Sequence, residues 1–515
     1  MRVAELAESL ADHTDRVQVG VRAGWLAAAV VCAGFAIRCI GIGGRWLTGD
    51  ELWSASLAKD GPWTALLTTA RFDVHPPLYY LQLSLWMLFG HSDQWLMLNS
   101  ILWGTAAVAL LTVAASEIHG PRIGLAAGAM LAVAPAALNY GDDVRMYPML
   151  LALIVLAWYT QARWLDGTSG RFGAFWMIVA QCAMAYSHGA ALVMLSGVVL
   201  LGGTTLLLRW DWRQLGRWIG IELVVGLLVS PTIIVALMRG VNHPAVPGFD
   251  NFLQTWTFLT TGDSTLQAPF VAGAVILLAV LLLGAELDSA AALQTGMLVF
   301  APLILAGVVS HAYKPVWLDR TFLPVVPFIC LGLARAPLDR GRTASRTPWY
   351  GAAVFAVLLL AWVGLAIPNQ ITREKGDGFK PAAALVHTLQ RPGDLIVCGP
   401  NYTYWYFLWY YAGPHWGEPR HAFILNADWQ HMMARLPPAL TAVLGLSEAD
   451  RTLHRNGVTI TLWDPDRPLP KTSGNIIVVG LRELEAVKIP GYRLASSTID
   501  TQILVERWVP DPRGD

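Results

Sequence analysis

Long apolar runs recur along most of this 515-residue chain, and they constrain its fold more than any other feature. A transmembrane α-helix needs about 20 consecutive, mostly apolar residues. The sequence therefore predicts an all-α polytopic membrane domain of about eleven transmembrane helices. The predicted spans are residues 21–43, 95–116, 121–138, 146–164, 172–187, 188–208, 217–238, 268–285, 293–310, 318–334 and 348–366.

The composition supports the same class. Only 14% of the residues are charged and 55% are hydrophobic, whereas soluble proteins carry about 25% charged residues. This excludes a water-soluble enzyme, a disordered chain and a coiled coil. The 36 basic residues balance the 36 acidic ones. Because no basic surplus exists, we expect no nucleic-acid partner.

The distribution of basic residues predicts the orientation. Residues 1–20 are too acidic for a cleaved signal peptide, so they form a cytoplasmic segment before a signal anchor. By the positive-inside rule, the cytoplasmic loops are those that carry most of the Lys and Arg. The parity holds if residues 77–90 lie along the outer surface as an interfacial helix rather than a span. The cytoplasmic basic residues are then Arg122, Arg163, Arg171, Arg209, Arg213, Arg217, Arg335, Arg340, Arg342 and Arg346.

This arrangement predicts a multi-pass protein of a bacterial inner membrane. The membrane domain covers residues 21–367 and includes a large first outer loop at 44–94. The polar residues 373–515 contain short strand-like runs that alternate with helical stretches, which predicts an α/β extracytoplasmic domain. Its predicted strands are 395–399, 421–425, 458–463, 475–480 and 502–508.

Polar residues that a bilayer tolerates poorly gather in the predicted outer segments. Glycosyl transfer from a lipid phosphate needs a carboxylate base for the acceptor hydroxyl and cations for the leaving phosphate. The outer segments contain both kinds of group. The candidates are Asp50, Glu51, Asp73 and His75 in the first loop, Asp142, Asp143, Arg145 and Tyr147 in the second, and His188, Lys314 and Arg320 at the ends of later spans.

Two motifs resemble a known family. Asp50-Glu51 followed by FDVHPPLYY at 72–80 resembles the first loop of protein O-mannosyltransferases, and YGDDVRMYPMLLAL at 140–153 resembles the YSQEARMYALL element of bacterial relatives. These proteins have the C-type glycosyltransferase (GT-C) fold, as does the lipid A aminoarabinose transferase. The resemblance implies a polyprenyl-phosphate-linked sugar donor and an inverting transfer on the exoplasmic face. It also implies that Asp50 is the general base, with Glu51 beside it.

The same resemblance carries over Arg145, which matches the Arg of the second element, and Asp143 as its acidic member. We expect Arg145 to bind the donor phosphate, with Asp142 or Asp143 fixing its guanidinium group. The acceptor is a glycan, a lipid or a protein; the C-terminal region lacks the MIR repeats of eukaryotic protein mannosyltransferases. No cofactor is expected, although a divalent metal held by Asp50, Asp73 and His75 is an alternative.

Several candidates also have structural explanations. Glu51 stands where it would complete a capping box with Thr48. His75 can orient the loop, His188 can be a buried core histidine, and Arg145, Lys314 and Arg320 can be interfacial anchors. Nine aromatic residues between Tyr402 and Trp416 indicate core packing, docking on the bilayer or the transferase loops, or a carbohydrate platform.

Two other functions remain open at this stage. One is a transporter or flippase of lipid-linked sugars, which should contain ionisable residues near mid-span and broken helices in two similar halves. Glu222 is the main acid inside an apolar run. The other is a ligase or polymerase of lipid-linked polysaccharides, for which a large outer loop late in the chain is typical.

Overall fold

The structure is a computed structural model with two compact units. It describes residues 22–73, 75–238, 246–265, 271–275, 277–278, 289–338, 348–373, 376–399, 401–415, 452–463, 468–481, 488–500 and 502–512. The membrane unit comprises the chain up to Ile42 together with 74–79 and 97–373, and the loop–sheet unit comprises 43–73, 80–96 and 374–515. The predicted first outer loop, 44–94, therefore contributes to both units.

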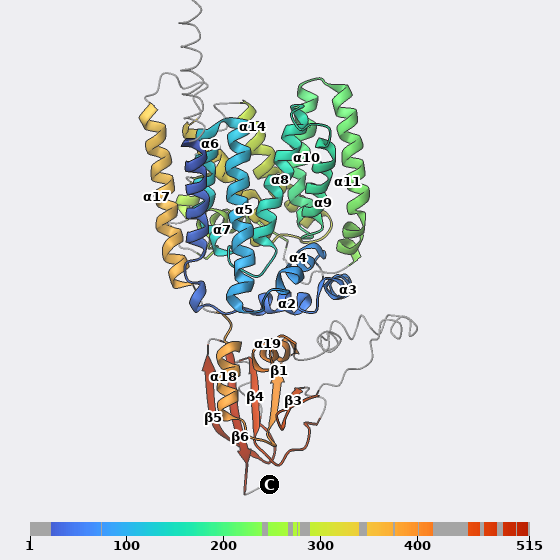
Figure 1. The fold of residues 1–515 in the computed structure, drawn as a ribbon, viewed down its shortest axis with the longest axis vertical. Helices are drawn as coiled ribbons and strands as arrows, with labels where there is room; N and C mark the ends of the chain where they lie inside the picture. The colour runs from blue at the N-terminus through green and yellow to red at the C-terminus, as the bar shows by residue number, and fades with distance from the viewer. Residues whose placement is uncertain are drawn as a thin grey trace, which may run out of the picture. The chain divides into compact units, whose positions relative to one another are not determined.

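The membrane unit is a bundle of helices that run along a common direction (Figure 1). A first helix at 22–38 precedes it in sequence. The following elements are α5 (Asp93–His119), α6 (Pro121–Val133), α7 (Pro135–Asn139), α8 (Tyr147–Leu165), α9 (Gly173–Ala185), α10 (Ala191–Leu208), α11 (Trp212–Met238), α12 (Phe249–Thr261), α14 (Ser289–Thr295), η2 (Gly296–Phe300), α15 (Ala301–Ala312), η3 (Asp319–Val325), α16 (Val326–Leu338) and α17 (Pro348–Thr372).

The predicted multi-pass helical class is confirmed. Within the described residues, eight helices are long and apolar enough to cross a membrane, and α6 and α9 are shorter apolar helices. Together these match ten of the predicted runs. The remaining run, 268–285, lies largely outside the described residues. Residues 77–90 contain the ten-residue helix α4 (Leu78–Met87), which is too short to span, as expected.

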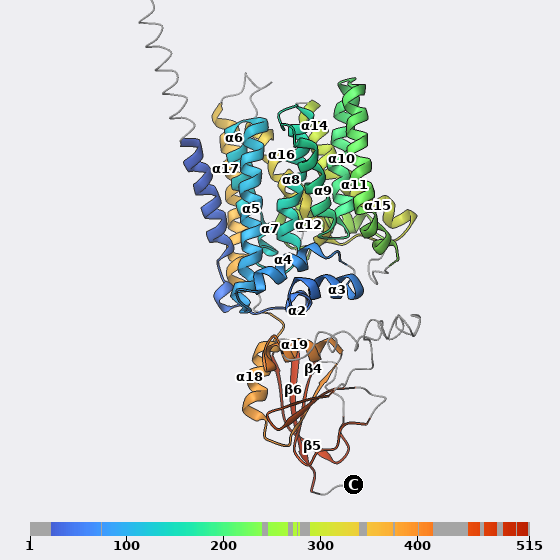
Figure 2. The same cartoon turned by 45° about the vertical axis from the view of Figure 1, so that its right-hand side comes forward.

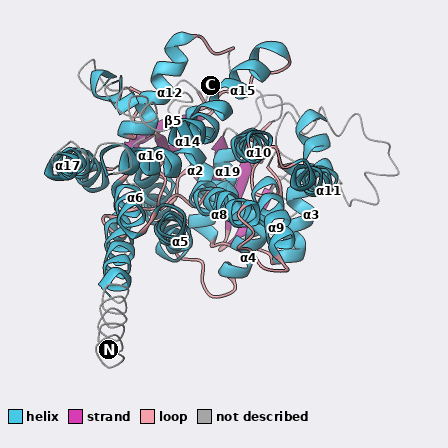
Figure 3. Ribbon diagram, turned by 90° about the horizontal axis from the view of Figure 1, so that it is seen from above, coloured by secondary structure: helices cyan, strands magenta, loops and turns pink. Residues whose placement is uncertain are grey.

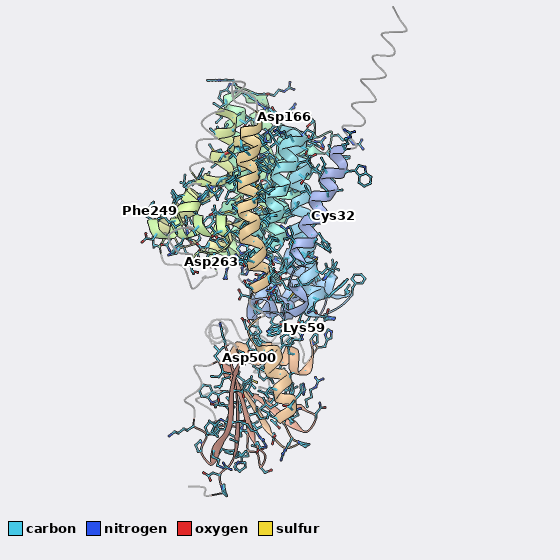
Figure 4. All side chains as sticks on the ribbon, turned by 90° about the vertical axis from the view of Figure 1, so that its left-hand side faces the viewer. Cys32, Lys59, Asp166, Phe249, Asp263 and Asp500 are labelled. Atoms are coloured by element: carbon cyan, nitrogen blue, oxygen red, sulfur yellow. The ribbon has the colours of Figure 1, made fainter. Side chains whose placement is uncertain are left out.

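The two ends of the bundle differ in charge. Figure 4 shows Asp166 and Asp263 at opposite ends of the membrane unit. The Asp166 end carries the turns between α8 and α9 and between α10 and α11, which contain predicted basic residues, and Arg209 pairs there with Asp166 at 3.0 Å. The Asp263 end carries the turns after α7, α9 and α15, which contain the candidate site residues. Among the described residues, the predicted inner and outer connections are thus separated onto opposite ends.

Helix α8 is central and α17 is peripheral. In the view along the bundle, α8 is enclosed by α5, α9 and α10, whereas α17 stands at the edge (Figure 3). The side chain of Trp158 on α8 is 1% exposed. Only 11% of the most apolar part of α17 is buried inside the protein. An apolar helix with so little protein contact fits a lipid-facing position.

A buried arginine in the first helix supports a break between α6 and α7. The Arg38 side chain is 1% exposed. Its guanidinium donates to the carbonyls of Leu131 (3.2 Å) and Ala132 (3.3 Å), in the last turn of α6. Pro135 has no N–H to offer the Leu131 carbonyl, which would otherwise be left without a donor. Arg38 therefore caps α6 from a neighbouring helix.

The loop–sheet unit contains a six-stranded mixed sheet. Its order is β2-β3-β1-β4-β6-β5, with β1 parallel to both β3 and β4, and with β2, β5 and β6 antiparallel to their neighbours. Figure 2 shows α18 alongside the sheet and α19 across one end of it. The remaining elements of this unit are α2 (Gly49–Ala58), α3 (Pro62–Phe72), α18 (Phe379–Leu389), β1 (Leu395–Gly399), α19 (Asn401–Ala412), β2 (Thr452–Arg455), β3 (Val458–Leu462), β4 (Ile476–Leu481), β5 (Tyr492–Asp500) and β6 (Ile503–Pro510).

The α/β prediction for the C-terminal region is confirmed in kind. Strands β1, β3, β4 and β6 occupy predicted runs, and 421–425 lies outside the described residues. Strands β2 and β5 were not predicted from the sequence. Both are edge strands of the sheet, and β5 is almost entirely exposed. An exposed edge strand needs no apolar run, so it leaves little hydrophobic signal.

The aromatic segment up to Tyr411 lies in α19, where most of the described side chains are buried, whereas Trp416 lies outside the described residues. Trp405 stacks on Trp53 of α2, with ring centroids 5.5 Å apart. Of the explanations that the sequence left open, core packing and docking on the transferase loop are both realised in this segment.

Candidate functional site

The membrane unit encloses a cavity of about 670 Å³ at the Asp263 end of the bundle. Its wall is mainly apolar, with side chains such as Leu192, Val193 and Ile233. The polar residues of the wall come from several connections between helices. They include five of the predicted site residues, namely His75, Tyr147, His188, Lys314 and Arg320. Residues separated by up to 245 positions in sequence are thus brought to one cavity.

Two histidines and a tyrosine form one side of this cavity. The rings of His75 and His188 are 4.8 Å apart, and Tyr147 lies 5.9 Å from His188. The Nδ1 atom of His188 accepts the N–H of Ala190 at 3.0 Å. In a neutral His188 the proton is therefore on Nε2. The Leu78 N–H donates to the Tyr186 carbonyl at 2.9 Å, which ties the segment of His75 to the end of α9.

Lys314 lies on the segment between α15 and η3, and Arg320 lies in the first turn of η3. This segment is fixed by Trp317, whose indole N–H donates to the Thr255 hydroxyl at 2.8 Å. Thr255 in turn donates to Asp319 at 2.5 Å. Lys314 is half-buried and Arg320 is exposed. A cavity with an apolar wall and cations near its mouth suits an amphiphile that has an anionic head.

A polar chamber of about 340 Å³ adjoins the cavity. Tyr140, Phe258 and Ser264 line both spaces. The chamber also contains Arg373, whose guanidinium forms ion pairs with both Asp142 and Asp143. Arg373 was not predicted as a site residue, because it lies 230 residues from Asp143 in a polar linker segment of the sequence.

Arg373 is thus a partner of Asp142 and Asp143, and the sequence did not identify it as one. We expected Asp142 or Asp143 to hold the guanidinium of Arg145, and that expectation remains a prediction. Arg145 itself is 6% exposed, and its backbone N–H donates to the Asp143 carbonyl at 2.6 Å. Arg373 thus offsets one of the two negative charges that Asp142 and Asp143 place beside the chamber.

Tyr140 stands between the two spaces as a hydroxyl donor. Burial raises the pKa of its hydroxyl, and the nearby Asp143 and Tyr147 raise it further, whereas Arg320 and Arg373 act in the opposite direction. The net upward shift keeps the phenol protonated at neutral pH. Tyr140 can therefore donate a hydrogen bond to a ligand oxygen.

The predicted catalytic acids lie in the loop–sheet unit. Asp50 is exposed in the first turn of α2. Glu51 is 1% exposed. Each of its two carboxylate oxygens accepts a hydrogen bond from the Arg45 guanidinium at 2.9 Å. It also accepts the Thr48 N–H at 2.7 Å, as a capping box requires. The structural explanation of Glu51 thus has direct support, while a catalytic role for it stays a prediction.

Asp73 organises the same loop. Its carboxylate accepts hydrogen bonds from the Trp53 indole at 3.0 Å and from the Tyr80 hydroxyl at 2.6 Å. The side chain is 4% exposed. Within the described part of the chain, no group of three or more His, Cys, Asp or Glu side chains is arranged to hold a metal. The metal alternative gains no support from this geometry.

Comparison with known proteins rests on structure. Neither a family model nor a curated protein matches the sequence. The solved structure of ArnT from Cupriavidus metallidurans in the apo state matches 95% of this chain and 98% of its own, with a TM-score of 0.58 and 15% identity. ArnT bound to undecaprenyl phosphate matches 94% and 98%, with a TM-score of 0.56 and 14% identity.

The chain has the C-type glycosyltransferase fold. This confirms the fold that the two loop motifs predicted. The match to ArnT covers nearly the whole of both chains, so it includes the membrane helices and the C-terminal sheet of this protein. At 15% identity the likeness establishes the architecture, so the chemistry must be argued from this chain's own residues.

Proposed function

We propose that this protein is an integral membrane glycosyltransferase. It would transfer a sugar from a polyprenyl-phosphate donor to a hydroxyl group of a glycan, lipid or protein acceptor, with inversion at the anomeric carbon. The observation that carries the proposal is the cavity of about 670 Å³, which combines an apolar wall with Lys314, Arg320 and two histidines. An isoprenoid chain suits the apolar wall, and its phosphate suits the cations.

The fold supports the same class of donor. ArnT, which shares the fold, has been solved with undecaprenyl phosphate bound. The motifs around Asp50 and Arg145 resemble those of transferases that use such donors. We propose that Lys314 and Arg320 meet the phosphate together with Arg145, while Tyr147 donates a hydrogen bond to it.

The reaction needs one base and a stabilised leaving group. The acceptor oxygen attacks the anomeric carbon and forms the new C–O bond. The bond from that carbon to the phosphate oxygen breaks, and its electron pair stays on the phosphate. Asp50 takes the proton of the acceptor hydroxyl. A single displacement of this kind inverts the configuration, and the cations stabilise the phosphate as its charge grows.

The charge distribution supports an exoplasmic site. The described basic loops lie at the end of the bundle opposite the cavity. By the positive-inside rule, the basic end faces the cytoplasm of a bacterial inner membrane. The N-terminus would then be cytoplasmic and the C-terminal region extracytoplasmic.

The decisive experiment is Asp50→Asn in a membrane assay with radiolabelled polyprenyl-phosphate sugar. The amide keeps the shape of the carboxylate but cannot take a proton, so turnover should fall about 10²–10⁴-fold. Asp166→Asn is a matched control, since Asp166 is an exposed acid at the other end of the bundle. Turnover by Asp50→Asn close to that of the control would exclude Asp50 as the base.

A transporter or flippase is the competing function. In the membrane unit, the mid-span acid Glu222 accepts a hydrogen bond from Gln181 at 3.0 Å. This acid therefore has a neutral partner inside the bundle. Liposomes that contain the purified protein separate the two functions. Sugar release from the lipid phosphate that depends on Asp50 supports a transferase, whereas movement of intact donor across the bilayer without release would support a flippase.

A further inference from the structure

The C-terminal sheet domain has no role in the chemistry described so far, yet it packs against the helix that carries the proposed base. Both belong to the loop–sheet unit. Three consecutive backbone N–H groups, those of Leu47, Thr48 and Gly49, lead directly into Asp50. N–H groups at the start of a helix have no partner within it, so their acceptors determine how the helix begins.

Two of these three acceptors come from the C-terminal region. The Leu47 N–H donates to the Tyr410 hydroxyl oxygen at 2.9 Å. The Gly49 N–H donates to the Asp377 carboxylate at 2.5 Å. The Thr48 N–H donates to Glu51 within α2 itself at 2.7 Å. The peptide groups on either side of Thr48 are thus held by residues more than 300 positions away.

Tyr410 is held in place by further contacts. Its hydroxyl donates to Asp93 at 3.2 Å, and Asp93 pairs with Lys380 of α18 at 2.8 Å. Burial raises the pKa of Tyr410, and the neighbouring Asp93 adds to the shift. The hydroxyl therefore keeps its proton and can donate to Asp93 while it accepts from Leu47.

The packing around Gly49 leaves little freedom. A Cβ atom at this position would lie 2.9 Å from the Tyr406 ring and 3.3 Å from the Asp377 carboxylate. The stacked pair of Trp53 and Trp405, with ring planes inclined by 17°, holds the next turn of α2. The start of α2 is therefore held both by hydrogen bonds to its backbone and by aromatic contacts.

We propose that the C-terminal domain positions the catalytic base, and that Tyr410 and Asp377 are its positioning residues. This inference rests on the proposed function, in which Asp50 is the base. Asp50 follows Gly49 directly, so a shift of the Leu47–Gly49 backbone moves its carboxylate. A displacement of about 1 Å from a reactive geometry can cost about 10²-fold in rate. The domain thus acts on the chemical step without contacting substrate.

The test separates the chemical step from binding. Tyr410→Phe and Asp377→Ala should each lower kcat about tenfold or more, while the KM for the lipid-phosphate sugar stays within about twofold, because misplacing the base does not alter donor binding. Asp377→Asn should retain most of the activity, since the amide oxygen can still accept the Gly49 N–H.

Tyr411→Phe is the matched control. It removes a tyrosine hydroxyl from the same helix, but that hydroxyl donates its hydrogen bond to Gln390, away from the Leu47–Gly49 backbone. We expect its kcat to equal that of the wild type. Thermal unfolding of all four variants shows whether a loss of activity reflects a loss of fold. An equal loss of kcat in Tyr411→Phe and Tyr410→Phe would refute positioning, as would a raised KM at unchanged kcat.

Failure of this inference is distinguishable from failure of the proposed function. If Asp50→Asn is inactive but Tyr410→Phe and Asp377→Ala turn over like wild type, the base assignment stands and the positioning role is wrong. If Asp50→Asn is active, the base assignment is wrong. If Asp377→Asn is as inactive as Asp50→Asn, the Asp377 carboxylate takes part in the chemistry itself, which also overturns a positioning role.

Discussion

Replacing Arg38 by Met removes the cap that holds the break between α6 and α7. The guanidinium serves the carbonyls of Leu131 and Ala132 at 3.2 and 3.3 Å. Each carbonyl left without a donor costs about 1–3 kcal/mol. Removing a charged side chain from the membrane interior regains about 2.5–3.5 kcal/mol. The two effects largely cancel, so the single variant should lose only about 1 kcal/mol of unfolding free energy.

The second substitution, Pro135→Ala, makes the effect measurable. Alanine restores an N–H that can reach the Leu131 carbonyl four residues earlier. In this background Arg38→Met leaves one carbonyl fewer without a donor. The double-mutant cycle should therefore give a coupling of about 1–3 kcal/mol, within the range for residues in contact. The measurement is unfolding of the purified protein in detergent for the wild type and all three variants.

Stability and activity should diverge in the double variant. Closing the break lets α6 continue, which moves α7 and the turn that carries Tyr140 and Tyr147. We therefore expect the double variant to bind polyprenyl phosphate more weakly than Arg38→Met, although it has one fewer carbonyl group without a hydrogen-bond donor. If the stability effects of the two substitutions simply add, the guanidinium does not cap α6 and the reasoning is refuted.

Four further predictions follow from the same structure. Gly104→Ala should destabilise the bundle by about 1–3 kcal/mol in detergent unfolding, because its Cβ would lie 2.8 Å from Arg38 Nε. Arg373→Gln should lower the Tm and weaken transfer more than Arg209→Gln does, since Asp142 is 3% exposed and would lose its ion pair with Arg373. Arg145→Lys should weaken binding of sugar-free polyprenyl phosphate, because the charge remains but the bidentate guanidinium is lost. An unchanged affinity would favour Lys314 or Arg320 as the phosphate-binding residue. A reporter that works only in the periplasm should be active when it is fused after Asp515, and a silent fusion would overturn the predicted topology.

The sequence was sufficient for those features that depend on local pattern. Runs of about 20 apolar residues predict spanning helices whatever surrounds them, because the bilayer forces each backbone to satisfy its own hydrogen bonds. The short run at 77–90 could be separated from the spans by its length together with the parity of the basic loops, and it contains the ten-residue helix α4. The capping box of Thr48 and Glu51 was also predictable from the sequence, since the two residues are only three positions apart.

The cavity was predicted in its members but not in its form. The sequence identified five of its lining residues as polar residues in outer loops or at the ends of spans, namely His75, Tyr147, His188, Lys314 and Arg320. That they line one space, beside a polar chamber, depends on how the helices pack and where the chain breaks at Pro135. Packing of this kind has no signature in a single segment.

Only the tertiary structure revealed the contacts that join distant segments. Arg373 pairs with Asp142 and Asp143 across about 230 residues, and Tyr410 and Asp377 hold the start of α2 from more than 300 residues away. Each is an ordinary residue in its local sequence. Its role arises because folding buries it beside a donor or a charge that must be satisfied, and that pairing is a property of the packed chain rather than of either segment.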